Sequence, residues 1–119
     1  MTIETVEING ARVLACAQEG PQLGREQDAL DLIAAGYEHQ AEFVVIPVQR
    51  LAPEFFQLRT GMLGAFVQKL QNYRFGVAFV GDLSAEVSQS TALRDFIHES
   101  RSGRTVMFVA DREELVKRL

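Results

Sequence analysis

Three short apolar runs, separated by segments with helical spacing, constrain the fold of this chain most. They are residues 43–46 (FVVI), 76–80 (GVAFV) and 105–109 (TVMFV). Because neighbouring strand residues point to opposite faces, runs that are apolar at successive positions indicate parallel strands buried on both faces. Strands that alternate with helices pair through right-handed crossovers. We therefore expect an α/β sheet covered on both faces, by helices or, if helices cover one face only, by another subunit.

The amino-terminal part of the chain predicts an antiparallel hairpin. Residues 3–8 and 11–17 read as strands, and Asn9-Gly10 between them suits a two-residue turn with positive φ at both positions. The predicted element order is β-β-α-β-α-β-α-β-α. This order describes a single domain over residues 1–119 with a mixed, mostly parallel sheet of about five strands and about four helices.

Four helical segments follow from periodicity and capping residues. The first runs near residues 24–35 and is expected to end at Gly36. The second runs from an N-cap at Thr60 to about residue 72, preceded by a segment from residue 53 that can form a separate short turn.

The third helix is capped by Ser88 or Ser90 and ends near Gly103. For the fourth helix, Asp111 and Glu114 form a capping-box pattern, which predicts a short final helix to residue 119.

Composition excludes several classes of protein. The 119 residues are 47% hydrophobic, which argues against disorder, and they carry a net charge of -4 with scattered Lys and Arg, which argues against nucleic-acid and membrane partners. A single cysteine, Cys16, excludes an intrachain disulfide and a CxxC site. No apolar run approaches the roughly 20 residues of a spanning helix, and the first residues lack the order of a signal peptide. We expect a cytoplasmic protein.

Residues 53–84 hold the candidate interaction or switch surface. Gly61 and Gly64 interrupt an apolar helical stripe, which favours close packing of this helix on its own sheet, with a ligand-facing backbone as the alternative. Thr60 is predicted as a cap, with phosphorylation as the alternative. Of the adjacent Phe55 and Phe56, one is expected at an interface, because neighbouring helical residues point about 100° apart.

Polar residues at the end of strand 76–80 extend this surface. Asp82 and Ser84 follow the strand, either as turn residues or at the carboxyl edge where open α/β sheets place ligands. In the ligand interpretation they converge with Arg59 and Thr60.

No motif predicts a catalytic, cofactor or metal site. The chain has no GxGxxG or GxxxxGK[ST] pattern. Cys16 lies in a strand pattern where a small core residue is expected, and the spacing of His39 and His98 does not favour a thiol nucleophile with a base. We therefore expect no catalytic residue, no cofactor and no metal ion.

The segments 27–36, 54–84 and 93–114 together resemble a small bacterial family, domain-of-unknown-function family 4180. They read QDALDLIAAG, EFFQLRTGMLGAFVQKLQNYRFGVAFVGDLS and LRDFIHESRSGRTVMFVADREE. The resemblance covers nearly the whole chain and implies no established activity, substrate or catalytic residue.

A more distant resemblance is to STAS domains of the anti-sigma-factor-antagonist type, which share this element order. Their D-S-S-G-L-G stretch carries a phosphorylated serine. Here Leu58 and Arg59 stand at the positions of its aspartate and phosphoserine, so Thr60 is the neighbouring hydroxyl.

These observations predict a non-catalytic, regulatory protein-interaction module of the bacterial cytoplasm. We expect a protein partner and a possible homodimer. The alternative is a small-molecule-binding or enzymatic domain that uses Arg59, Thr60 and Asp82 at the carboxyl edge of the sheet.

Overall fold

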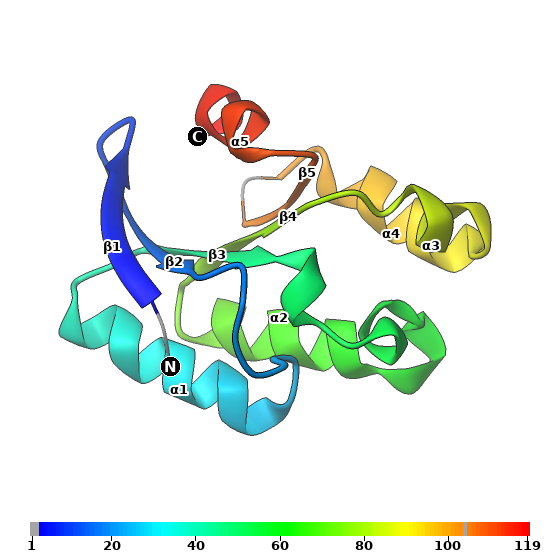
Figure 1. The fold of residues 1–119 in the computed structure, drawn as a ribbon, viewed down its shortest axis with the longest axis horizontal. Helices are drawn as coiled ribbons and strands as arrows, with labels where there is room; N and C mark the ends of the chain where they lie inside the picture. The colour runs from blue at the N-terminus through cyan, green and yellow to red at the C-terminus, as the bar shows by residue number, and fades with distance from the viewer. Residues whose placement is uncertain (1–2, 104) are drawn as a thin grey trace.

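The computed structural model describes residues 3–103 and 105–119, and Figure 1 shows them as one curled sheet with helices on both faces. The strands lie in the order β1-β2-β3-β4-β5. They are β1 (Ile3–Ile8), β2 (Ala11–Cys16), β3 (Phe43–Pro47), β4 (Gly76–Val80) and β5 (Val106–Val109). The α-helices in the described ranges are α1 (Glu26–Glu38), α2 (Met62–Asn72), α3 (Ser84–Ser88), α4 (Thr91–Ser100) and α5 (Arg112–Arg118).

The predicted hairpin is confirmed. β1 pairs with β2 in antiparallel register, with Ile8 opposite Ala11. Asn9 and Gly10 form the turn with φ of 51° and 85°, the left-handed region that Asn and Gly tolerate best. The remaining neighbours, β2–β3, β3–β4 and β4–β5, pair in parallel. The mostly parallel α/β sheet expected from the sequence is therefore present.

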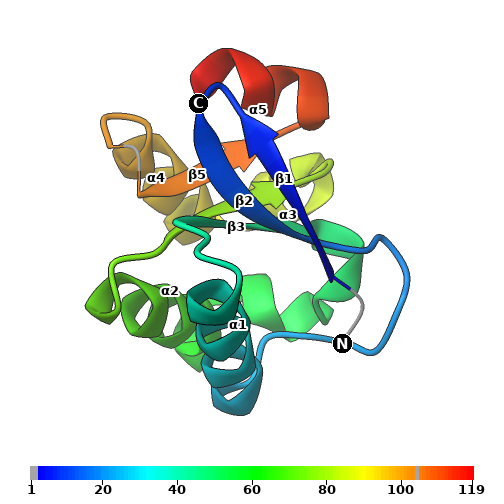
Figure 2. The same ribbon diagram turned by 90° about the vertical axis from the view of Figure 1, so that its left-hand side faces the viewer.

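Helices α1, α2 and α4 lie on one face of the sheet (Figures 1 and 2). Each connects a strand to its next neighbour, and all three steps cross the sheet in one direction. Right-handed crossovers that advance in one direction must lie on the same face. One apolar cluster accordingly joins the three helices to this face, and Leu32, Leu63 and Leu93 are its fully buried contributions from α1, α2 and α4.

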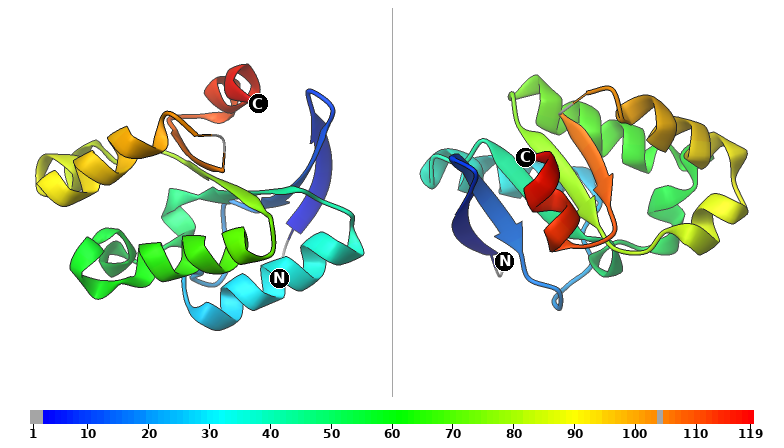
Figure 3. Two further views of the ribbon diagram at one scale, coloured as in Figure 1. Left: turned by 180° about the vertical axis from the view of Figure 1, so that it is seen from behind. Right: turned by 90° about the horizontal axis from the view of Figure 1, so that it is seen from above.

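The opposite face is covered by α5 of the same chain. Figure 3 (right) shows α5 lying across this face, where its Leu115 is fully buried in a second apolar cluster with Val13 and Met107. The sheet curls around α5 so that the hairpin turn reaches it, and Asn9 Nδ2 donates a hydrogen bond to Val116 O at 2.6 Å. The prediction of two covered faces holds, and burial of these strands needs no second subunit.

Local capping chemistry sets several helix starts. Asp111 caps α5 by accepting a hydrogen bond from Glu114 N at 2.9 Å, and Glu114 Oε1 accepts one from Ala110 N at 2.7 Å, as the capping-box pattern predicts. Of the two predicted caps for α4, Ser90 is the one used, accepting from Leu93 N at 3.1 Å. The residues before Ser90 form α3, a short helix that the sequence analysis did not predict.

Two helix boundaries differ from the prediction. The segment before α2 forms three short 3-10 turns, η1 (Val48–Arg50), η2 (Pro53–Phe56) and η3 (Leu58–Thr60). Helix α1 runs through Gly36, where the prediction ended it, because the left-handed residue that follows the helix is Gln40, with φ of 56°, and Gly36 instead leaves room for the ring of Phe75. Within residues 3–103 and 105–119, no helix combines the length and the apolar character that crossing a membrane requires.

Candidate functional site

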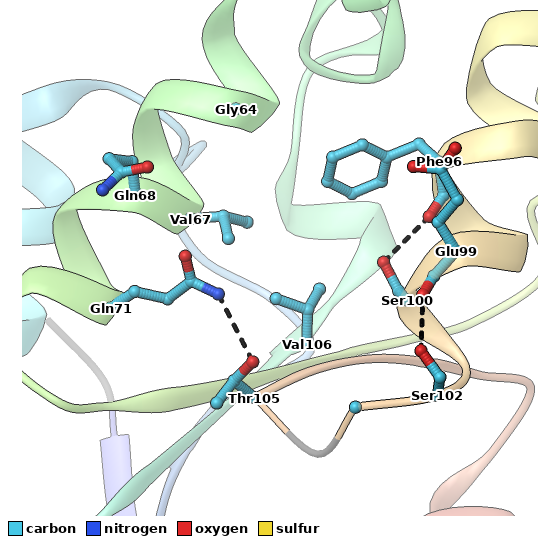
Figure 4. Close-up of a pocket in the computed structure, with 11 residues that line it drawn as sticks. Gly64, Val67, Gln68, Gln71, Phe96, Glu99, Ser100, Ser102, Thr105 and Val106 are labelled. Carbon is cyan, nitrogen blue, oxygen red and sulfur yellow. Dashed lines mark hydrogen bonds between the residues drawn. The ribbon is translucent and has the colours of Figure 1, made fainter.

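Two grooves follow one side of α4. The α2–α4 groove has a volume of about 400 Å³ and lies between α2 and α4, beside the start of β5 (Figure 4). The η3–α3 groove has a volume of about 540 Å³ and lies between the turns after β3 and the helices after β4. Ala92 lines the second groove, and Phe96 and Glu99 line the first. Because these residues are four and three positions apart, they form one stripe along α4 that joins the two grooves.

The α2–α4 groove has an apolar floor and a polar rim. Val67, Phe96 and Val106 form the floor, and Figure 4 shows the three side chains pointing into the space between the helices. Gln71 stands on the rim and donates through Nε2 to Thr105 Oγ1 at 3.3 Å. Glu99 is the one charged residue among the described residues that line the groove. The lining therefore combines apolar contact with neutral hydrogen-bonding groups.

Gly64 lies on the α2 side of this groove, and within residues 3–103 and 105–119 no contact requires a glycine there. It is the third residue of α2, it is exposed, and a Cβ built on it meets no atom within 4 Å. Its φ also lies outside the left-handed region that favours glycine. The predicted role of Gly64 in helix-to-sheet packing is therefore wrong.

Gly61 is explained by backbone conformation and not by packing. Its φ is 76° and its ψ is -3°, and a Cβ there would also meet no atom within 4 Å. A left-handed residue is needed where η3 turns into α2, which is why glycine occurs at this position. The packing prediction is wrong for this glycine as well.

Thr60 is not the N-cap that the sequence predicted for α2, because the helix starts one residue later. Gly61 is the N-cap, and Thr60 Oγ1 accepts a hydrogen bond from Met62 N at 3.2 Å. The same oxygen lies 2.8 Å from Gln57 O and 3.1 Å from Glu54 O, to which the hydroxyl can donate. The hydroxyl is thus engaged in local hydrogen bonds at the turn that leads into α2, and it supports the helix start without being its N-cap.

Asp82 and Ser84 form a turn at the start of α3. Asp82 Oδ1 accepts from Ser84 N at 2.8 Å. This backbone bond, followed by a bond to the Ser84 hydroxyl, holds the pKa of Asp82 below its ordinary value. Both residues are exposed, and their contacts are those of the turn interpretation.

The predicted convergence at the carboxyl edge does not occur in the four grooves found over the described residues. Arg59 lines the η3–α3 groove, whereas Thr60 and Gly61 line a separate groove of about 580 Å³ between α1 and α2. Asp82 and Ser84 line none of the four. The sheet is also wound in one direction only, so it lacks the strand-order reversal that creates a ligand crevice in doubly wound folds.

Phe55 is a core residue and not a surface residue, which corrects its place in the candidate surface. It is 0% exposed and Phe56 is 4% exposed. Their rings contact each other edge to face at 5.2 Å between centroids, and both contact Phe79 of β4. Both rings are buried because Phe55 also packs against Phe66 of α2, so that α2 and β4 together enclose the two side chains.

Arg50 is a buried residue that no sequence pattern singled out. It is 2% exposed, and its guanidinium donates through Nη1 to Ala17 O at 2.7 Å and through Nε to Pro21 O at 3.0 Å. Gly20 gives it room, since a Cβ there would lie 2.9 Å from Arg50 Cζ. Arg50 therefore fastens the loop between β2 and α1 to η1.

Cys16 lies beside this arrangement, and its thiol is buried. Burial raises the pKa of its thiol to about 11, and the nearby charge of Arg50 opposes this shift only in part. Within the described part of the chain, no three or more His, Cys, Asp or Glu side chains gather as a metal site would need.

Comparisons with known proteins identify the family. Neither the search of curated proteins nor the search of solved structures found a match. One family model, a domain of unknown function (DUF4180), matches residues 8–119, which include every element that lines the two grooves. The distant likeness to STAS domains stays a prediction. Because the family model covers nearly the whole sequence, this chain belongs to the DUF4180 family.

Proposed function

We propose that this chain is a non-catalytic protein-interaction module that binds an amphipathic helix of a partner protein in the α2–α4 groove. Gly64 is the observation that carries the proposal. A glycine inside a helix costs about 0.5–1 kcal/mol relative to alanine. Neither its backbone conformation nor its contacts with the described part of the chain require a glycine, so a close approach by a partner is the reason that we propose for it.

The lining of the groove suits a helix. An amphipathic helix docks by laying its apolar face into an apolar groove between polar rims. Val67, Phe96 and Val106 offer the floor, and Gln71 on α2 reaches toward it, as Figure 4 shows. Glu99 on the α4 rim favours a partner helix with a Lys or Arg beside its apolar stripe.

We place this activity in regulation in the bacterial cytoplasm. The single buried cysteine suits a reducing compartment, and the scattered charge with a net value of -4 suits a protein partner better than nucleic acid or an anionic membrane.

Photocrosslinking in the native cell tests the proposal. A photoreactive residue at Gln68 lies on α2 between this groove and the groove that faces α1, so the Gly64 variants below are needed to assign the capture. The same photoreactive residue at Leu30, an exposed position on α1, is the control. We expect the probe at position 68 to capture a protein through an amphipathic helical segment, with the attachment located by mass spectrometry. The Leu30 probe should not capture it.

A second substitution in the same chain ties the captured protein to the groove. Gly64→Met places a long side chain in the groove and should reduce capture strongly, whereas Gly64→Ala adds one methyl group and should reduce it much less. Equal capture by both probes, or capture unaffected by Gly64→Met, would overturn the proposal. Absence of any Gln68-dependent product under all growth conditions would do the same.

A further inference from the structure

The two edges of the sheet differ in how well they are protected. At the β5 edge the strand has only four residues, and Arg118 Nη1 donates to the outward-facing Phe108 O at 3.4 Å. At the other edge, β1 has six residues in regular register, with no partner on its outer side among the described residues. It contains no Pro and no Lys, two residues that commonly prevent strand addition at an edge, and its charged residues are Glu4 and Glu7.

The hairpin fixes which groups of β1 face outward. In a hairpin with a two-residue turn, the residues that flank the turn bond to each other, and bonded pairs alternate from there. The backbone groups of every second residue therefore form hydrogen bonds to β2, and these residues are Ile8, Val6 and Glu4. The backbone N–H and C=O groups of the residues between them point away from β2, and these residues are Ile3, Thr5 and Glu7. The hydrogen bond from Glu42 N to Arg12 O agrees with this alternation, because Arg12 stands opposite Glu7 and faces the next strand.

We propose that β1 pairs with β1 of a second copy of this chain, antiparallel about a two-fold axis, with Thr5 opposite Thr5 of the second copy. Two identical edges related by a two-fold axis can pair only in antiparallel orientation. In this register all three outward-facing residues of each copy form bonded pairs. The result is one continuous sheet across both copies.

The side chains of β1 are compatible with this register. Glu7 stands opposite Ile3 of the second copy, and Glu4 stands opposite Val6, so no carboxylate opposes another. Threonine opposite threonine is a favourable cross-strand pair. Registers centred on Glu4 or on Glu7 would place like charges opposite each other, and the register centred on Val6 leaves Ile3 unpaired.

A proline at the axis tests the interface without breaking the hairpin. Thr5→Pro removes an N–H that faces outward, where an edge strand tolerates proline. Thr5→Val keeps the N–H and is the matched control. In sedimentation velocity over a series of concentrations, we expect the unsubstituted chain and Thr5→Val to form dimers as concentration rises and Thr5→Pro to remain monomeric. A dimer that persists in Thr5→Pro, or a chain that is monomeric at every concentration, would overturn the proposal.

Amide hydrogen exchange on the unsubstituted chain gives a second readout that needs no variant. The amides of Glu4, Val6 and Ile8 should be protected at all concentrations. Those of Thr5 and Glu7 should exchange fast in dilute solution and become protected as the dimer forms. If they stay fast in concentrated solution, or are protected even at high dilution by another segment or protein, the second copy is not the occupant. Gly64→Met should leave the dimer unchanged, so this test and the test of the α2–α4 groove can fail separately.

Discussion

Two glycines in helices give opposite predictions for the same substitution. Gly64→Ala places a methyl group in open space, because no atom lies within 4 Å of the added Cβ. The free energy of unfolding should rise by about 0.5–1 kcal/mol, because alanine has a higher helix propensity than glycine and lowers the conformational entropy of the unfolded chain. For a domain of this length, that gain corresponds to a rise in Tm of roughly 2–5 °C.

Gly36→Ala brings the same intrinsic gain but meets a filled core. The added Cβ would collide with the Cε1 and Cζ atoms of Phe75, which is 3% exposed and packs edge to face on Tyr37. Overpacking of this kind costs about 1–3 kcal/mol. The loss exceeds the gain in propensity, so we expect Gly36→Ala to be less stable than the unsubstituted chain.

Urea unfolding followed by circular dichroism measures both substitutions, with unchanged m-values as the control for two-state behaviour. The expected order of stability is Gly64→Ala, then the unsubstituted chain, then Gly36→Ala. A destabilised Gly64→Ala would mean that its own fold requires this glycine. That outcome would also remove the observation that carries the proposed helix-binding groove.

Two further predictions concern the buried loop anchor and the cysteine beside it. Arg50→Ala leaves the carbonyls of Ala17 and Pro21 without their charged donor, so we expect the free energy of unfolding in urea to fall by about 3 kcal/mol or more. Arg50→Lys should lower it less. A fall below about 1 kcal/mol for Arg50→Ala would contradict the anchor role. Since the pKa of Cys16 is raised to about 11 from 9.0, the unfolded chain ionises first, and stability should fall as pH rises between these values by up to about 2–3 kcal/mol. Cys16→Ala should abolish this part of the pH dependence in thermal unfolding, and an unchanged pH profile in that variant would refute the assignment.

Features that depend on a few neighbouring residues could be predicted from the sequence. Asn9-Gly10 determines the hairpin because the turn needs two positive φ values, and Asp111 with Glu114 determines the start of α5 because both partners lie within one helical turn. The apolar runs likewise predicted the parallel strands. The turn and the cap depend on residues that are close in the sequence, and the strands are recognisable from the pattern of apolar residues along them.

The roles of the candidate site residues depend on contacts between segments that lie far apart in the sequence. Gly36 and Gly64 are the same residue type in similar helical surroundings, yet only the position of Phe75 makes one a packing glycine and leaves the other facing a groove. Phe55 was expected at a surface and lies in the core, because η2 turns its ring toward β4.

By itself, then, the sequence determined the class of fold, the hairpin and the capping box of α5, since these arise from backbone conformation and short-range hydrogen bonds. Only the tertiary structure decided which residues face the groove between α2 and α4 and which edge of the sheet is left open. Those properties depend on the spacing of elements that meet after the chain has folded, and no single segment carries that information.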